Sequence, residues 1–169
     1  CMTTQTIENA VGFLIDNAQG VPHGNGTYIE HCLGVFNILK EFGAPDDVCL
    51  AGLFHSIYGS ESFNPNLQIT RQQVLELIGF QAEQLVFNFC NMQDKDNVIL
   101  SKEGKDEMFF ISYANLKEQA NRNGDPALHE LLKRYEAKLD VAPVATVPQE
   151  SQFINFEHIE LDDKDIFIF

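Results

Sequence analysis

The sequence predicts a single all-α domain, and three observations support this prediction. Apolar residues recur at helical spacing in several successive segments. Loops rich in glycine and proline separate these segments, and residues that cap helices stand at several of their starts. No stretch of the first 140 residues alternates polar and apolar residues for long enough to predict a strand. We therefore expect a bundle of about six to eight helices.

A glycine-rich loop separates the first two predicted helices. Residues 3–18 carry apolar side chains at helical spacing and predict an amphipathic first helix. Residues 20–26 contain three glycines and a proline and predict a loop. Residues 27–41 predict a second helix, and Thr27 and Glu30 have the spacing of a capping box at its start.

The third predicted helix carries a histidine near its end. It begins at Pro45, a residue favoured in the first turn, and continues through His55 to about Tyr58. Residues 59–69 are rich in Gly, Ser, Asn and Pro and predict a loop.

Four further helices complete the predicted domain. Asp125 caps the last of them and Pro126 takes its first position. Residues 94–104 are polar and predict an exposed connection. The expected bounds of the four helices are residues 70–78, 80–92, 105–121 and 126–139.

The chain divides into a helical domain, residues 1–140, and a tail, residues 141–169. Residues 141–148 have the Pro, Ala, Val and Thr composition of a linker. The rest of the tail mixes phenylalanines with carboxylates. Three alternatives stay open for the tail: a docked strand, a segment that binds a partner, or the remnant of a further domain.

The charge of the chain excludes some classes of partner. Its net charge is −14, from 11 basic and 25 acidic residues. Proteins that bind nucleic acid or anionic membranes use clustered Lys and Arg to neutralise phosphates. We therefore expect neither partner.

The apolar segments and the cysteines indicate where in the cell we expect the protein. No apolar stretch approaches the ~20 residues that span a bilayer, and no secretory signal is visible at the start. Cys32, Cys49 and Cys90 lie in apolar segments without a CxxC pair, which is typical of small buried hydrophobes. We therefore expect a cytoplasmic protein.

Two histidines lie on the apolar faces of consecutive predicted helices. His31 shares its face with Val35 and Ile38, and His55 shares its face with Val48. Because helices joined by a short loop run antiparallel, we expect the two imidazoles to meet. Paired imidazoles suit Zn, Fe, Mn or Ni. Either histidine taken alone is explained more simply as a hydrogen-bonded core residue.

The segments around these histidines resemble the HD superfamily, and most closely the RelA/SpoT-type hydrolase domain. Residues 26–31 (GTYIEH) are similar to its PYxxHP helix, and residues 49–55 (CLAGLFH) to the start of its ALLHDxxED motif. Residues 106–119 are similar to its DVRxxxIKLADRxxN helix. Residues 55–61 (HSIYGSE) also look like a little-characterised bacterial group with HSxYGTE sequences. The resemblance implies an HD-like helical bundle that holds a divalent metal.

Several positions depart from the HD pattern. Ser56 stands in place of the HD aspartate, and Gly59 and Ser60 in place of a catalytic Glu-Asp pair. Asn115 stands in place of the last metal-binding aspartate, and Gln119 in place of an asparagine one turn later. Mn²⁺ favours anionic oxygen ligands, and two are missing here. The resemblance therefore supports the fold more strongly than it supports an activity.

The resemblance and the local sequence together give three groups of candidate site residues. By role, they are the metal ligands His31, His55 and His23, the catalytic residues Glu61 and Tyr58, and the substrate contacts Ser56, Asn115 and Gln119. His23 and Glu61 have simpler explanations as an exposed loop histidine and a solvated surface glutamate. Arg71 and Arg122 are the obvious candidates to contact a phosphate.

Two classes of function stay open, so the sequence does not decide whether the chain is an enzyme. In the first, a degenerate HD-type domain with one Mn, Fe or Zn ion hydrolyses a nucleotide-like or other small phosphate ester. An HD-type iron oxygenase is a variant, but it needs more histidines and carboxylates than these. In the second, a non-catalytic, metal-free HD-like module binds a small ligand or a partner. A protein partner or a second copy of the chain would then bind through the tail.

Overall fold

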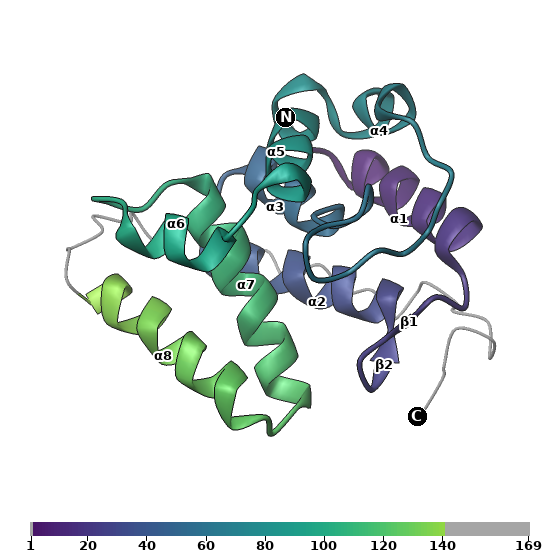
Figure 1. Cartoon of the computed structure of the whole chain (residues 1–169). Helices are drawn as coiled ribbons and strands as arrows, with labels where there is room; N and C mark the ends of the chain where they lie inside the picture. The colour runs from purple at the N-terminus through teal and green to yellow at the C-terminus, as the bar shows by residue number, and fades with distance from the viewer. Residues whose placement is uncertain (1, 141–169) are drawn as a thin grey trace.

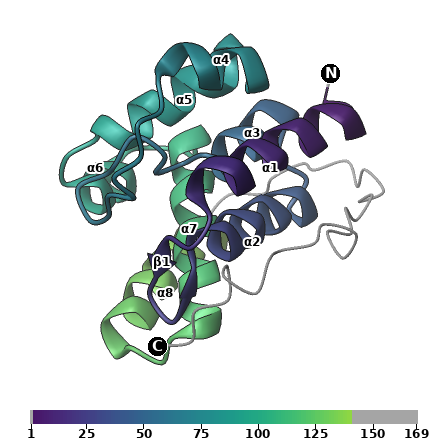
Figure 2. The ribbon, with the colours of Figure 1, turned by 90° about the vertical axis from the view of Figure 1, so that its right-hand side faces the viewer.

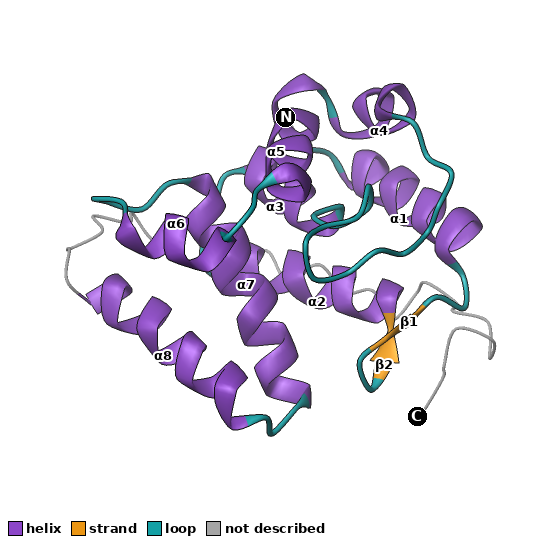
Figure 3. Ribbon diagram, viewed as in Figure 1, coloured by secondary structure: helices purple, strands orange, loops and turns teal. Residues whose placement is uncertain are grey.

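The described part of the chain, residues 2–140, folds into eight α-helices and one short β-hairpin (Figure 1). The predicted all-α fold class is confirmed, and Figure 3 shows how little of the chain is strand. The interpretations of residues 141–169 lie outside the described residues. In chain order, the elements are α1 (Thr4–Ala18), β1 (Pro22–His23), β2 (Gly26–Thr27), α2 (Tyr28–Glu41), α3 (Asp46–Leu53), α4 (Arg71–Ile78), α5 (Phe80–Asn91), α6 (Lys95–Ser101), α7 (Glu107–Arg122) and α8 (Pro126–Asp140).

Helix α2 lies in the middle of the bundle and packs against α3 and α7 (Figure 1). It begins where predicted, because the Thr27 hydroxyl accepts the backbone N–H of Glu30 at 3.2 Å. Only this half of the predicted capping box forms. The Glu30 carboxylate instead accepts a hydrogen bond from Arg122 of α7 at 2.9 Å. The start of α2 is therefore tied to the end of α7.

The hairpin β1–β2 is a local feature that the sequence pattern does not predict. Pro22 pairs with Thr27 and His23 with Gly26, and Gly24 makes the turn with a φ of +53°. Two residues per strand are too few to show alternation, so periodicity cannot reveal this ladder. The hairpin holds His23 beside the first turns of α2.

Helix α3 is shorter than predicted. It ends at Leu53, and residues 54–58 continue as a series of turns. Phe54 has φ −112° and ψ 12°, which departs from helical geometry. His55 therefore lies just beyond the helix, in a turn that is closed by its own hydrogen bonds to Gly52.

Helix α6 corrects the prediction that residues 94–104 are an exposed connection. Residues 95–101 form a helix, and Lys95 and Ile99 are buried. The carboxylate of Glu61 accepts the backbone N–H groups of Asp94 and Lys95 at 2.9 and 3.1 Å. This cap comes from a distant loop, so local sequence gives no sign of it.

Helices α7 and α8 close the bundle on the side of α6 (Figure 2). Asp106 caps α7 by accepting the N–H of Phe109 at 3.1 Å. Tyr135 of α8 is fully buried, and its hydroxyl donates to Asp96 of α6 at 2.7 Å. Cys32, Cys49 and Cys90 are buried, as predicted. Within residues 2–140, no helix combines the length and the apolar character that crossing a bilayer requires.

Gly52 lies where α3 meets α2, and the Gly52→Ala substitution tests this packing. A Cβ atom at Gly52 would collide with the Cδ1 atom of the buried Leu39 and lie 3.3 Å from Val35. We expect Gly52→Ala to lower the free energy of unfolding by about 1–3 kcal/mol, because the added methyl group overpacks the core. A urea titration measures this change.

Gly12→Ala in α1 is the matched control, because nothing lies within 4 Å of its Cβ position. It should stabilise the protein by up to about 1 kcal/mol, since glycine disfavours the helix. Equal effects of the two substitutions would contradict the close contact of α2 and α3.

Candidate functional site

His31 and His55 meet in the core of the bundle, as predicted. Their Nε2 atoms lie 3.1 Å apart, and the two residues are only 1% and 2% exposed. His31 comes from the first turn of α2, and His55 from the turn that follows α3. The contact therefore depends on how α2 and the end of α3 pack.

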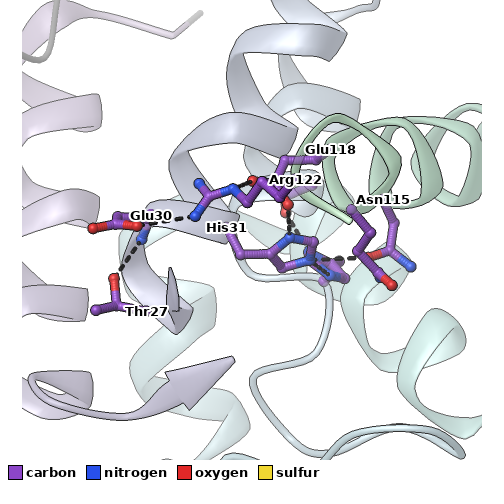
Figure 4. Close-up of polar contacts among 9 residues, drawn as sticks. Thr27, Glu30, His31, Asn115, Glu118 and Arg122 are labelled. Carbon is purple, nitrogen blue, oxygen red and sulfur yellow. Dashed lines mark hydrogen bonds and ion pairs between the residues drawn. The ribbon is translucent and has the colours of Figure 1, made fainter. Parts of the chain in front are cut away.

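The second nitrogen of each ring is held by an acceptor. His31 Nδ1 contacts the Glu118 carboxylate of α7, as Figure 4 shows. His55 Nδ1 lies 2.8 Å from the backbone carbonyl oxygen of Gly52, which can only accept. Arg122 contacts both Glu118 and Glu30, so its guanidinium favours the ionised form of the Glu118 carboxyl. With Glu118 ionised, both imidazoles donate a hydrogen from Nδ1.

This arrangement directs lone pairs at one another. A neutral imidazole that carries its hydrogen on Nδ1 has a lone pair on Nε2. The Nε2 atoms of His31 and His55 face each other, and the Oδ1 atom of Asn115 lies 2.9 Å from His31 Nε2. The two imidazole lone pairs point at each other whether the oxygen or the nitrogen of the Asn115 amide faces His31. A cation between them, either a proton or a metal ion, would relieve the repulsion.

The surroundings disfavour a proton at this place. Burial lowers the pKa of His31 to about 3, although its hydrogen bond with Asn115 acts in the opposite direction. Burial, together with the neighbouring His31, lowers the pKa of His55 well below its ordinary value. Burial raises the pKa of Glu118, and the guanidinium of Arg122 opposes that shift. A neutral pair of histidines therefore faces the Asn115 amide.

His23 lies against the cluster but differs in orientation. Its ring stacks on that of His31, with centroids 4.0 Å apart and planes 12° apart. The lone pair of an imidazole nitrogen lies in the plane of its ring. Because the rings of His23 and His31 are stacked, their lone pairs lie in parallel planes and do not point at one common position. Phe63 packs edge-on against His23. The structure thus places His23 as a wall of the site.

A small cavity of about 20 Å³ adjoins the cluster. It has room for one water-sized group. The predicted substrate contacts Ser56, Asn115 and Gln119 all line it, and Gln119 also donates to Asn115 Oδ1 at 2.9 Å. The other lining residues are His23, His55, Ser60, Ser62, Phe63, Phe89 and Lys95.

The predicted catalytic residues point elsewhere. The Glu61 carboxylate accepts backbone N–H groups at the start of α6, and the Tyr58 hydroxyl donates to Glu83 at 2.9 Å. Neither residue lines the cavity. Arg71 forms two hydrogen bonds of 2.7 Å with Glu83, and Arg122 is paired with Glu118 and Glu30. Both arginines are therefore occupied by carboxylates.

The sequence pattern did not indicate two residues of the site, Glu118 and Lys95. Glu118 lies one turn after Asn115, and this spacing on the same helix face could have indicated it. Lys95 lines the cavity and is buried, but its polar sequence neighbours gave no sign of burial. Among residues 2–140, no group of three or more His, Cys, Asp or Glu side chains is arranged to hold a metal ion. Any metal here would bind to two imidazoles and an amide.

The buried histidines predict acid sensitivity. Because the pKa of His31 is about 3 when folded and ordinarily 6.5, the unfolded chain binds its proton first as the pH falls. The contribution of His31 to the free energy of unfolding is therefore complete above pH 6.5 and declines below it. Between pH 6.5 and 5, this one group should lower the free energy of unfolding by about 2 kcal/mol. Urea titrations of chelator-treated protein at the two pH values measure the change.

His31→Gln removes this group and should make the decline shallower by the same amount. An unchanged pH dependence in that variant would show that His31 is not buried in its neutral form.

The comparisons with known proteins give one match. A family model described as "Domain of unknown function (DUF6817)" matches residues 14–94, just under half of the chain. The matched segment contains His23, His31 and His55, whereas Asn115 and Glu118 lie beyond it. No curated protein and no solved structure matches the chain significantly. The chain is thus similar over this segment to a family whose function is unknown.

Proposed function

We propose that His31, His55 and the amide oxygen of Asn115 bind one divalent transition-metal ion, in an HD-like domain that hydrolyses a small phosphate ester. The HD-like assignment comes from the sequence resemblance. The metal and the reaction class are inferences from the chemistry of the cluster.

One observation supports the metal most strongly. The two Nε2 atoms face each other at 3.1 Å while both Nδ1 atoms donate to fixed acceptors. Histidines that bind metals usually have this arrangement, in which a carboxylate or a carbonyl holds the other ring nitrogen. The acceptors Glu118 and Gly52 thus fix each ring in the tautomer that a metal requires.

The donor set indicates which metals to test. Imidazole suits Zn and Fe, and an added oxygen ligand is compatible with Mn. Two imidazoles and one amide oxygen are neutral, and they leave coordination positions that a ligand in the adjoining cavity could fill. The Glu118 carboxylate, held against His31 Nδ1, raises the basicity of that ligand and supplies negative charge nearby. When bound, the metal would act as a Lewis acid on an oxygen of the substrate.

A non-catalytic ligand-binding module is the second candidate. It is favoured by the absence, among the described residues, of a carboxylate whose oxygen directly faces the two Nε2 atoms. The cavity is also small, and neither Glu61 nor Tyr58 reaches it. In this alternative, the histidines and the cavity bind a small molecule and release it without a chemical reaction.

Metal analysis tests the first part of the proposal. Protein that is purified without chelator, or reconstituted with Zn²⁺, Mn²⁺ or Fe²⁺, should contain about one equivalent of metal per chain by elemental analysis. The double variant His31→Ala/His55→Ala should lose it. Wild-type protein that folds normally and binds none of these metals would contradict the proposal.

Two further variants sharpen this result. His129→Ala changes an exposed histidine of α8 and should leave the metal content unchanged. Glu118→Gln keeps an acceptor for His31 but removes the charge. It should weaken the metal affinity by roughly 10- to 100-fold, as the loss of such outer partners does.

Turnover separates the two candidate functions. Metal-loaded protein should release phosphate from at least one member of a panel of nucleotides and small phosphate esters, and chelated protein should not. Saturable binding of a panel member to metal-loaded protein without turnover would favour the non-catalytic module.

A further inference from the structure

The cavity beside the histidine pair is smaller than any phosphate ester. Its volume is about 20 Å³, which holds one water-sized group. Pockets that bind small organic molecules commonly measure about 300–1,000 Å³. A phosphate ester can therefore reach His55 only if part of the wall of the cavity moves.

One side of this wall is the loop that joins α3 to α4. Ser60, Ser62 and Phe63 of this loop line the cavity. Residues 59–70 contain no helix or strand, as Figure 3 shows. The other lining residues belong to the hairpin, to the turn after α3, or to helices α5, α6 and α7. The loop is thus the part of the wall that can move without disrupting a helix, and we refer to residues 60–64 as the lid.

The lid is held together by contacts within its own segment. The backbone N–H of Ser60 donates to the carbonyl oxygen of Phe63 at 2.7 Å. The side chain of Asn64 lies over Gly59, 3.1 Å from the position that a Cβ atom would take there. Gly59 has a φ of +88°, a conformation that favours glycine, and the buried Pro65 follows the lid at its other end. A segment with internal contacts of this kind can move as a unit about its ends.

Two sets of contacts hold the lid against the rest of the bundle. The Phe63 ring lies against the rings of His23 and Tyr28, with centroids 4.7 and 5.5 Å apart. The exposed Glu61 accepts two backbone N–H groups at the start of α6. Asp94 takes the N-cap position of α6, but its own side chain makes no capping hydrogen bond in the described structure. The lid therefore supplies the side-chain cap of this helix.

We propose that the lid opens to admit the substrate to the histidine pair, and that Glu61 is the latch that keeps it closed. Moving the lid removes the side of the wall that Phe63 forms and leaves His55 and Asn115 facing the opening. The latch suits this role because an exposed carboxylate exchanges its hydrogen bonds with water at little cost. The inference rests on the proposed function only for the identity of the molecule admitted.

The reactivity of His55 toward a reagent larger than water tests the lid in the absence of metal. Diethyl pyrocarbonate acylates the neutral imidazole, and mass spectrometry of peptides from chelator-treated protein gives the rate at each histidine. We expect His55 to react much more slowly than the exposed His129 in the wild type. In Glu61→Ala, the rate at His55 should rise about 3- to 30-fold, which corresponds to the loss of a helix cap.

Thr3→Ala is the matched control. The Thr3 hydroxyl caps α1 by accepting the N–H of Thr6 at 3.1 Å, and α1 contributes no described residue to the wall of the cavity. This substitution removes a comparable cap and should leave the rate at His55 unchanged. Glu61→Gln keeps one acceptor oxygen and should raise the rate less than Glu61→Ala does. An equal rise in Thr3→Ala, or an unchanged rate in Glu61→Ala, would overturn the inference.

Metal exchange separates this inference from the proposed function. If the wild type binds Zn²⁺, Glu61→Ala should release it to excess chelator faster by a similar factor, with little change in affinity, because a lid changes access and not the ligands. A parallel loss of affinity would overturn the role of Glu61 as a latch. His55 that is protected by Glu61 in a protein that binds no metal would support the lid and contradict the metal proposal. A metal-binding protein in which His55 reacts as fast as His129 would overturn the lid alone.

Discussion

The placement of the site depends on one interaction, the buried contact between the Nε2 atoms of His31 and His55. Two neutral imidazoles with lone pairs facing at 3.1 Å repel each other, so other contacts must hold the rings in place. The Glu118 carboxylate and the Gly52 carbonyl do so from the Nδ1 side, and Arg122 fixes Glu118 in turn. Helices α2, α3 and α7 therefore pack in a way that preserves an electrostatically unfavourable contact.

That cost is the reason to infer a bound cation. A fold that only needed to fill its core would place an apolar side chain at one of these positions. The cluster instead combines two histidines, an amide and a nearby carboxylate, and the buried Lys95 side chain lines the cavity beside it. The nearby negative charge lies on Glu118, which contacts His31 Nδ1 on the side away from the two facing Nε2 atoms.

Much of this structure could be predicted from the sequence because it depends on local patterns. Helical periodicity and the caps Thr27 and Asp125 located most helices, and the placement of His31 and His55 on apolar faces predicted their contact. The missed features depend on distant partners. Glu61 caps α6 from another loop, so α6 and the burial of Lys95 had no local signal. The sequence made Arg71 and Arg122 candidates to contact a phosphate, yet the fold pairs them with Glu83 and Glu118.

The position of the hydrogen on each imidazole decides whether the two Nε2 lone pairs face each other. Nitrogen chemical shifts of histidine side chains, measured by NMR on chelated protein at neutral pH, distinguish Nδ1–H from Nε2–H. We predict that His31 and His55 both carry their hydrogen on Nδ1, and that added Zn²⁺ shifts the signals of both Nε2 atoms. A hydrogen on Nε2 of either ring in the chelated protein, with no change on adding Zn²⁺, would contradict it.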